Sequence, residues 1–440
     1  MKKTFSLLFT TFTSFLLFSA GLYSQDFNKR NDTSANMFED YLISKTLRVD
    51  FFLAGGNKEQ TIYLNEMKQE PNWGGPHKNL VDPFNLGTYR YQAFDSLSGK
   101  LLFSRGFCTL FQEWKGTPEA EKVKKAFAQT AIMPFPKNTI RFVISERGFD
   151  DGLFYNRFEV FINPKDYFIN REKPHPYPYI KFRNSGDPAQ KVDVAYIAEG
   201  YTEEEMSKFL LDAQRITDNF LSASPYSEFR NRFNFYAILS PSIESGVDVP
   251  GKDLYFNTNV NSTFYTFGMD RYMTSFDTRS IYDIAANVPY DVIIILVNSK
   301  LYGGGGFFNH YAEITVDNPW SKVVALHEFG HSFAGLADEY AGSVSYSDTY
   351  NVKVEPWEPN ITTNVDFSSK WKSMISHGTP IPTPRTEEYK SSVGMFVGGG
   401  YLEKGIYSPY EDCRMKTNEA PAFCPVCQQA IRRMILFYCD

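Results

Sequence analysis

The sequence lacks any run of basic residues, although it contains 45 lysines and arginines among its 440 residues. Its 51 acidic residues are mixed with the basic ones along the chain, and the formal net charge is −6. Proteins that bind nucleic acid or an anionic membrane surface concentrate positive charge in patches or runs. We therefore expect neither nucleic acid nor a lipid surface as a partner.

The sequence also lacks a second long apolar run; its single one lies at the N-terminus. Lys2 and Lys3 precede an apolar stretch over residues 5–20, and small residues follow up to Ser24. This layout is typical of a secretory signal peptide, and the stretch is short for the alternative, a membrane anchor. No cysteine lies near the cleavage region, which excludes a lipid-modified cysteine there. We expect residues 1–24 to be removed on export, leaving a secreted, periplasmic or cell-surface protein without a membrane span.

Cysteine is scarce, with five residues in the chain. Cys413, Cys424, Cys427 and Cys439 lie in the last 28 residues, and Cys108 stands apart. In an exported protein such cysteines are usually oxidised, so we expect one or two disulfides, whose pairing the sequence does not give. A four-cysteine zinc site is the alternative, because Cys424 and Cys427 have the spacing of metal ligands.

No cluster of ionisable residues in 25–185 suggests chemistry, and His77 and His175 each stand alone. One charged helix is expected around Pro118–Gln129. The rest of this part predicts a β-sandwich domain, which either positions a substrate or shields the following domain. The boundary lies near residue 185, after a proline-rich connector. Short segments rich in β-branched and aromatic residues predict strands at 47–53, 60–64, 89–94, 100–103, 139–145 and 157–162.

Residues 186–440 follow a different pattern, in which strands alternate with helices. An amphipathic helix is predicted at Glu203–Leu221, and Thr202 is its candidate N-cap. The predicted strands are Val192–Ala198, Arg232–Leu239 and Asp291–Asn298.

A run of four glycines, residues 303–306, precedes a further predicted strand at Tyr311–Val316. An edge strand of a sheet can pair with an extended peptide through main-chain hydrogen bonds. We predict Tyr311–Val316 as such an edge strand, and the glycine run is either part of the approach to it or a flexible loop.

The chemistry-bearing stretch is VVALHEFGHSFAGLADEY, residues 323–340. It contains the HExxH motif as His327, Glu328 and His331. Two histidines four positions apart on a helix project from nearly the same face, so both can bind one metal ion. Glu328 stands beside the first ligand, where its carboxylate can hold a metal-bound water.

A catalytic zinc site needs a third protein ligand and one open position. Asp338 and Glu339 are the nearest candidates, but a straight helix would carry Asp338 about 10 Å beyond His331. Gly335 can end the helix, because glycine enters the left-handed conformation without steric cost. The chain can then turn back, so either carboxylate remains a candidate.

HExxH followed by a helix-ending glycine and a later ligand resembles the metzincin zinc peptidases. HEFGHSFAGLADEY, with DCRM at 412–415 and FCPVC at 423–427, is similar to the bacterial IgA metallopeptidase family over about residues 190–440. The chain departs from the metzincin pattern in two ways: the glycine comes one residue later, and the third ligand would be an aspartate instead of a histidine. The metzincin spacing from glycine to ligand favours Asp338 over Glu339.

The resemblance implies an α+β chain in which the β-sandwich precedes a zincin- or metzincin-like α/β catalytic domain over residues 186–440. It also implies that Met415 forms the methionine turn, a structural floor beneath the metal. A tyrosine would stabilise the oxyanion, and Tyr340 and Tyr407 are candidates, as are Tyr401 and Tyr410.

We predict an exported zinc-dependent endopeptidase that acts on protein or peptide substrates. Zn²⁺ bound by His327, His331 and Asp338 would polarise a peptide carbonyl, and Glu328 would accept a proton from the attacking water. The family implies immunoglobulin A cleavage for some relatives, and other host glycoproteins such as mucins remain open. The alternative is a surface binding or adhesion protein with a structural zinc site. Glu328 argues against it, because a purely structural site has no use for that carboxylate.

Overall fold

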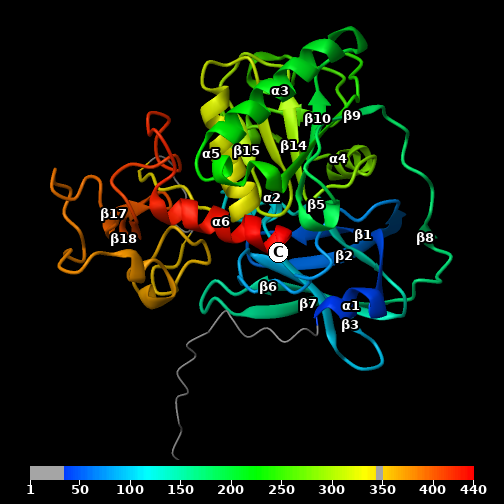
Figure 1. Ribbon diagram of the computed structural model, residues 1–440, viewed down its shortest axis with the longest axis horizontal. Helices are drawn as coiled ribbons and strands as arrows, with labels where there is room; N and C mark the ends of the chain where they lie inside the picture. The colour runs from blue at the N-terminus through cyan, green and yellow to red at the C-terminus, as the bar shows by residue number, and fades with distance from the viewer. Residues whose placement is uncertain (1–33, 343–349) are drawn as a thin grey trace, which may run out of the picture.

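The structure is a computed structural model that describes residues 34–342 and 350–440 (Figure 1). It contains both helices and sheets, in an N-terminal domain followed by a larger domain. The expected signal peptide, residues 1–24, lies outside the described residues. None of the helices described is long and apolar enough to cross a membrane.

The N-terminal domain contains two four-stranded sheets, with strand orders β5-β1-β2-β8 and β4-β3-β6-β7. Buried residues alternate along β3, as expected for a strand with one face toward a core. Both sheets contribute to one hydrophobic core, in which the rings of Phe51 and Phe107 lie 6.4 Å apart. The β-sandwich itself stays a prediction. The elements are α1 (Ser34–Tyr41), β1 (Leu42–Gly55), β2 (Gln60–Glu70), β3 (Tyr89–Asp95), β4 (Leu101–Phe107), α2 (Leu110–Lys115), β5 (Lys125–Pro136), β6 (Ile140–Arg147), β7 (Phe154–Ile162) and β8 (Ile169–Asn170).

The helix expected around Pro118–Gln129 is wrong. Residues 118–122 form turns, and β5 begins at Lys125. Charged residues favoured a helix locally, but antiparallel pairing with β1 along the length of β5 supplies its backbone partners and buries Phe127. The helix of this region is the shorter α2, whose N-cap Thr109 accepts a hydrogen bond from the backbone of Gln112.

The larger domain is built on a six-stranded sheet with strand order β15-β16-β14-β10-β11-β9. The four inner strands are parallel, and the two edge strands run antiparallel to their neighbours. Every residue of β10, β11 and β14 is buried, as expected for parallel strands covered on both faces. The strands are β9 (Tyr179–Arg183), β10 (Val192–Glu199), β11 (Phe233–Ile238), β12 (Ser262–Thr263), β13 (Thr274–Ser275), β14 (Val292–Val297), β15 (Gly304–Gly306), β16 (Ala312–Thr315), β17 (Phe396–Gly399) and β18 (Leu402–Ser408).

The two faces of this sheet belong to different cores. Val194 and Tyr196 of β10 pack with residues of α3, α5 and α6, whereas Ala195 and Ile197 join the core shared with the N-terminal domain. In Figure 1, α6 (red) crosses between the sheet and the N-terminal strands, and Arg105 of β4 lies over a ring of α6. The helices of the larger domain are α3 (Met206–Ser222), α4 (Thr278–Ala285), α5 (Ser321–Ala334) and α6 (Pro425–Cys439).

The prediction of Tyr311–Val316 as the edge strand is wrong. That segment contains β16, which pairs with β14 on one side and β15 on the other. The edge is formed by Gly304–Gly306 as β15, so the glycine run is a strand and not a flexible loop. Tyr272 and Met273 lie against its outer side, where Met273 donates a backbone hydrogen bond to Gly304.

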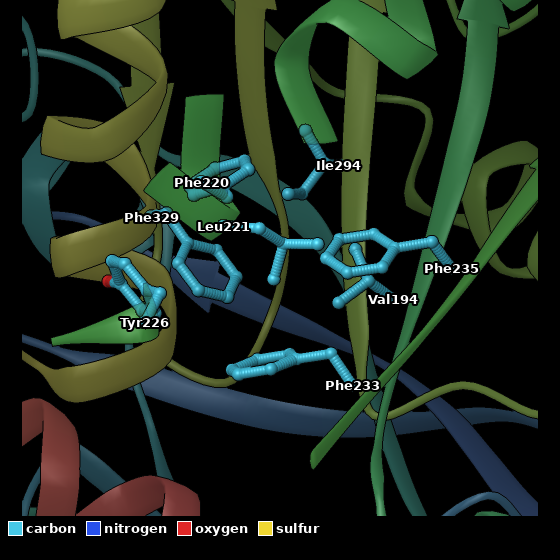
Figure 2. A pocket seen from close by; sticks show the side chains of 8 residues that line it. All are labelled: Val194, Phe220, Leu221, Tyr226, Phe233, Phe235, Ile294 and Phe329. Atoms are coloured by element: carbon cyan, nitrogen blue, oxygen red, sulfur yellow. The ribbon is translucent and has the colours of Figure 1, made fainter. Parts of the chain in front are cut away.

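A small cavity of about 10 Å³ lies between the sheet and helices α3 and α5. Figure 2 shows the apolar side chains that surround it, including Phe220 of α3, Phe329 of α5 and Phe235 of β11. A space of this size holds at most about one water molecule, and its lining offers almost no polar partner. We interpret it as a packing gap in the core and not as a ligand site.

Candidate active site

The helix α5 ends at Gly335, as predicted. Gly335 has φ 62°, and its N–H donates to the backbone carbonyls of Gly330 and His331. A side chain there would be strained by this φ, and its Cβ would lie 2.9 Å from the ring of Trp357. The left-handed residue reverses the chain, so that Leu336 and the residues after it return along the helix.

The return brings Asp338 to the two histidines of HExxH. The Nε2 atoms of His327 and His331 lie 3.0 Å apart, and Asp338 Oδ1 lies 3.1 Å from the first and 3.4 Å from the second. Ligands about 2.0–2.1 Å from a tetrahedral zinc ion stand about 3.3 Å from one another. The three atoms therefore have the mutual spacing of three corners of a zinc tetrahedron.

Backbone carbonyls fix which nitrogen of each histidine faces this point. His327 Nδ1 lies 3.0 Å from the Arg414 carbonyl oxygen, and His331 Nδ1 lies 2.6 Å from that of Leu336. A carbonyl only accepts, so each Nδ1 carries a proton, and in the neutral, metal-binding form of each ring Nε2 presents its lone pair. This is the usual orientation of metal-ligating histidines by a second hydrogen bond.

The Asp338 carboxylate is oriented in the same way. Tyr401 donates a hydrogen bond to Oδ2, and the buried Oδ1 has no hydrogen-bond partner of its own. Burial alone would raise the pKa of Asp338, but the histidines hold it well below its ordinary range. Burial alone would lower the pKa of His331, but the Asp338 and Glu328 carboxylates and the Leu336 carbonyl together raise that pKa to about 9. The site therefore favours positive charge between these groups, which a divalent cation would supply.

Glu328 faces the edge strand beside this group. A Cβ on Gly304 would lie 2.9 Å from the Glu328 side chain, and one on Gly306 would lie 2.4 Å from its carbonyl oxygen. The glycines thus let β15 run directly against α5. Burial raises the pKa of Glu328. The side chains of His327 and His331 are 18% and 17% exposed, so solvent reaches the group.

Met415 packs against α5 at Gly330, and its role as a methionine turn stays a prediction. It is fully buried, and its sulfur would be 2.9 Å from a Cβ placed on Gly330. Gly330 lies between the histidines in sequence, so the absence of a side chain allows this close packing. The Met415 carbonyl also accepts a hydrogen bond from Glu339 at 2.7 Å, which joins the turn to the returning chain.

The candidate tyrosines differ in their surroundings. Tyr340 is half-buried, and its hydroxyl interacts with Asp338 and, over a longer range, with Glu328 and Arg271. The Tyr401 hydroxyl donates a hydrogen bond to Asp338 Oδ2 and is therefore already engaged. Tyr407 packs its side chain against the core that contains α5 and α6, and its backbone pairs with the 362 position.

Glu339 points away from the histidines. Its Oε1 lies 3.0 Å from Cys427 Sγ and accepts a hydrogen bond from Asn360 at 2.9 Å. The five cysteines are free thiols, so the expected disulfides are not formed in the structure. Cys413, Cys424 and Cys427 gather around Glu339, whereas Cys439 lies apart with its sulfur 3.6 Å from the Arg232 carbonyl.

Three further residues near the site were not singled out from the sequence. Glu113 of α2 accepts a hydrogen bond from Tyr272 and interacts electrostatically with His331. Arg271 interacts in the same way with Glu328. Glu113 belongs to the N-terminal domain, so that domain reaches the rim of the site. Sequence offers no signal for this approach, because it depends on how the two domains pack.

Comparison with known proteins places these observations in a family. Residues 180–389 and 385–435 match the family model described as IgA Peptidase M64, and residues 37–158 match that of the Peptidase M64 N-terminus. No curated protein matches the sequence. The catalytic model covers more than half of the chain and includes the whole HExxH segment. The protein therefore belongs to the IgA peptidase M64 family.

Proposed function

We propose that the protein is an exported zinc endopeptidase with a metzincin-like catalytic domain. The observation that carries the proposal is the triangle of His327 Nε2, His331 Nε2 and Asp338 Oδ1, with separations of 3.0–3.4 Å, beside a half-buried Glu328. Two imidazoles and one carboxylate are a donor set that zinc accepts, and the solvent-exposed side leaves room for a fourth position. Membership of a peptidase family supports hydrolysis over adhesion.

In this proposal each residue has a distinct role. Zinc held there would act as a Lewis acid and would lower the pKa of water toward neutrality. Glu328 accepts the proton of the attacking water and passes it to the leaving amine. Tyr401 and the Arg414 and Leu336 carbonyls hold the three ligand side chains in place.

Tyr340 is our proposed oxyanion stabiliser, because its hydroxyl lies close to Asp338 on the partly exposed side of the site. Tyr340→Phe should lower kcat by about 10²–10³-fold with little change in KM, as loss of one oxyanion donor does. Tyr407→Phe is the matched control and should keep wild-type kinetics. Steady-state cleavage of a quenched fluorescent peptide measures both variants. If Tyr340→Phe kept the wild-type kcat, Tyr340 would not be the oxyanion stabiliser.

The substrate is a protein, and we propose immunoglobulin A or another host glycoprotein such as a mucin. The family description and the expected export of the chain support this choice. Neither nucleic acid nor a membrane is a proposed partner, since the net charge of −6 includes no basic run.

Cleavage assays with and without a chelator test the proposed function. Purified protein lacking residues 1–24 should cleave at least one of immunoglobulin A, mucin and casein. A chelator should abolish the cleavage, and added Zn²⁺ should restore it. Binding to a glycoprotein without cleavage, unchanged by the chelator, would instead support the adhesion alternative.

A further inference from the structure

A second cluster of metal-ligating side chains lies behind the active site. Cys413, Cys424, Cys427 and Glu339 are each at most 3% exposed. One ligand atom from each lies within 4.8 Å of the others. Three segments supply them: the turn before Met415, the chain returning from α5 and the start of α6.

The sulfur geometry fits metal ligands better than a disulfide. The Sγ atoms of Cys413 and Cys427 lie 3.8 Å apart. A disulfide needs about 2.05 Å, whereas two sulfurs each about 2.3 Å from a tetrahedral zinc ion stand about 3.8 Å apart. Backbone N–H groups also point at the sulfurs, from Cys424 to Cys413 at 3.2 Å and from Cys427 to Cys424 at 3.5 Å. Such donors stabilise thiolates, the form that binds metal.

The Glu339 carboxylate lacks a cation of its own. Its Oε1 is held by Asn360, but the buried Oε2 has no hydrogen-bond partner. Lys416 interacts with Glu339 only at a distance and donates to the Glu411 carbonyl at 2.6 Å. Burying a carboxylate oxygen without a partner costs free energy, and a cation bound among these side chains would offset that cost.

We propose that Cys413, Cys424, Cys427 and Glu339 hold a structural zinc ion, separate from the one at the histidines. Three thiolates and a carboxylate suit zinc, and four buried protein donors leave no open position, as in structural sites. The ion would join the 413–415 turn to the chain around residue 339 and to α6. Because Arg414 orients His327 and Met415 bonds to Glu339, the second ion would position the active site without touching substrate.

Metal content of the purified holoprotein tests the proposal directly. Inductively coupled plasma mass spectrometry should find two zinc ions per wild-type chain, one in Asp338→Asn and one in Cys427→Ser. Cys439→Ser is the matched control, since its sulfur lies outside the cluster on the same helix, and it should retain both ions.

Cobalt substitution separates the two sites and does not depend on Cys427→Ser folding. Wild type and Asp338→Asn loaded with Co²⁺ should both show thiolate-to-metal charge-transfer absorption, because the histidine site has no sulfur ligand. Loss of peptidase activity alone would leave this band unchanged, so failure of the proposed function and failure of this proposal are distinguishable.

Counting the free thiols of the unfolded protein can show that the proposed cysteine zinc site is wrong. Unfolded in chelator without reductant, the exported protein should expose five free thiols. A count of three, together with one zinc ion per chain and no charge-transfer band, would show that two of the clustered cysteines form a disulfide, and the second zinc site would be wrong.

Discussion

Glu328→Gln should lower kcat for peptide cleavage by about 10²–10⁴-fold while leaving the zinc content unchanged. Glutamine has nearly the same shape, but it cannot accept the proton of the attacking water. Glu328 forms no side of the triangle of His327, His331 and Asp338 donors, so its replacement should not release the ion. Activity against casein and metal content, measured on the same preparation, check both parts.

Glu387→Gln is a suitable control for the Glu328 variant, because it makes the same chemical change at an exposed position. It should keep wild-type activity. If Glu328→Gln cleaved casein at close to the wild-type rate with its zinc in place, another group would have to take the proton, and the assignment would be wrong.

Asp338→Asn should lose the ion at the histidines and, with it, measurable activity. The variant replaces a charged ligand by a neutral amide and removes the negative charge that keeps the pKa of His331 near 9 in the metal-free group. Zinc content should fall by one ion per chain, and casein cleavage should drop below detection. Circular dichroism should show that the fold is retained.

Glu339→Gln provides the reciprocal comparison. The Glu339 carboxylate lies by Cys427 and not by the histidines, so the ion at the histidines should remain and cleavage should stay measurable. Should Glu339→Gln abolish all cleavage and empty the histidine site while Asp338→Asn keeps both, Glu339 would be the third ligand.

Local patterns were enough to predict the parts of the fold that local physics decides. The apolar run at Asp291–Asn298 predicts β14 because a strand buried on both faces must be apolar throughout. Gly335 predicts the end of α5 because glycine adopts its left-handed conformation without strain. The same glycine places Asp338 and Glu339 on a returning chain, and the spacing from glycine to ligand favoured Asp338, whose carboxylate lies beside the histidines in the structure.

Long-range pairing caused the errors. The charged stretch at Pro118–Gln129 favours a helix by itself, but pairing with β1 makes its second part a strand. Tyr311–Val316 was predicted as the edge strand, but Gly304–Gly306 pairs with it on its outer side. The association of Glu339 with cysteines more than 70 positions later depends on three segments meeting, as does the approach of Glu113. Sequence spacing predicts neither, because each contact depends on how whole elements pack.

Anomalous diffraction at the zinc absorption edge, from crystals of the wild-type protein, is the sharpest test of the proposed zinc site. We expect a peak bonded to His327 Nε2, His331 Nε2 and Asp338 Oδ1 at about 2.0–2.2 Å, with its fourth side toward solvent. A zinc-loaded, active crystal without density at that point, or with an imidazole turned away from it, would show that zinc does not bind there.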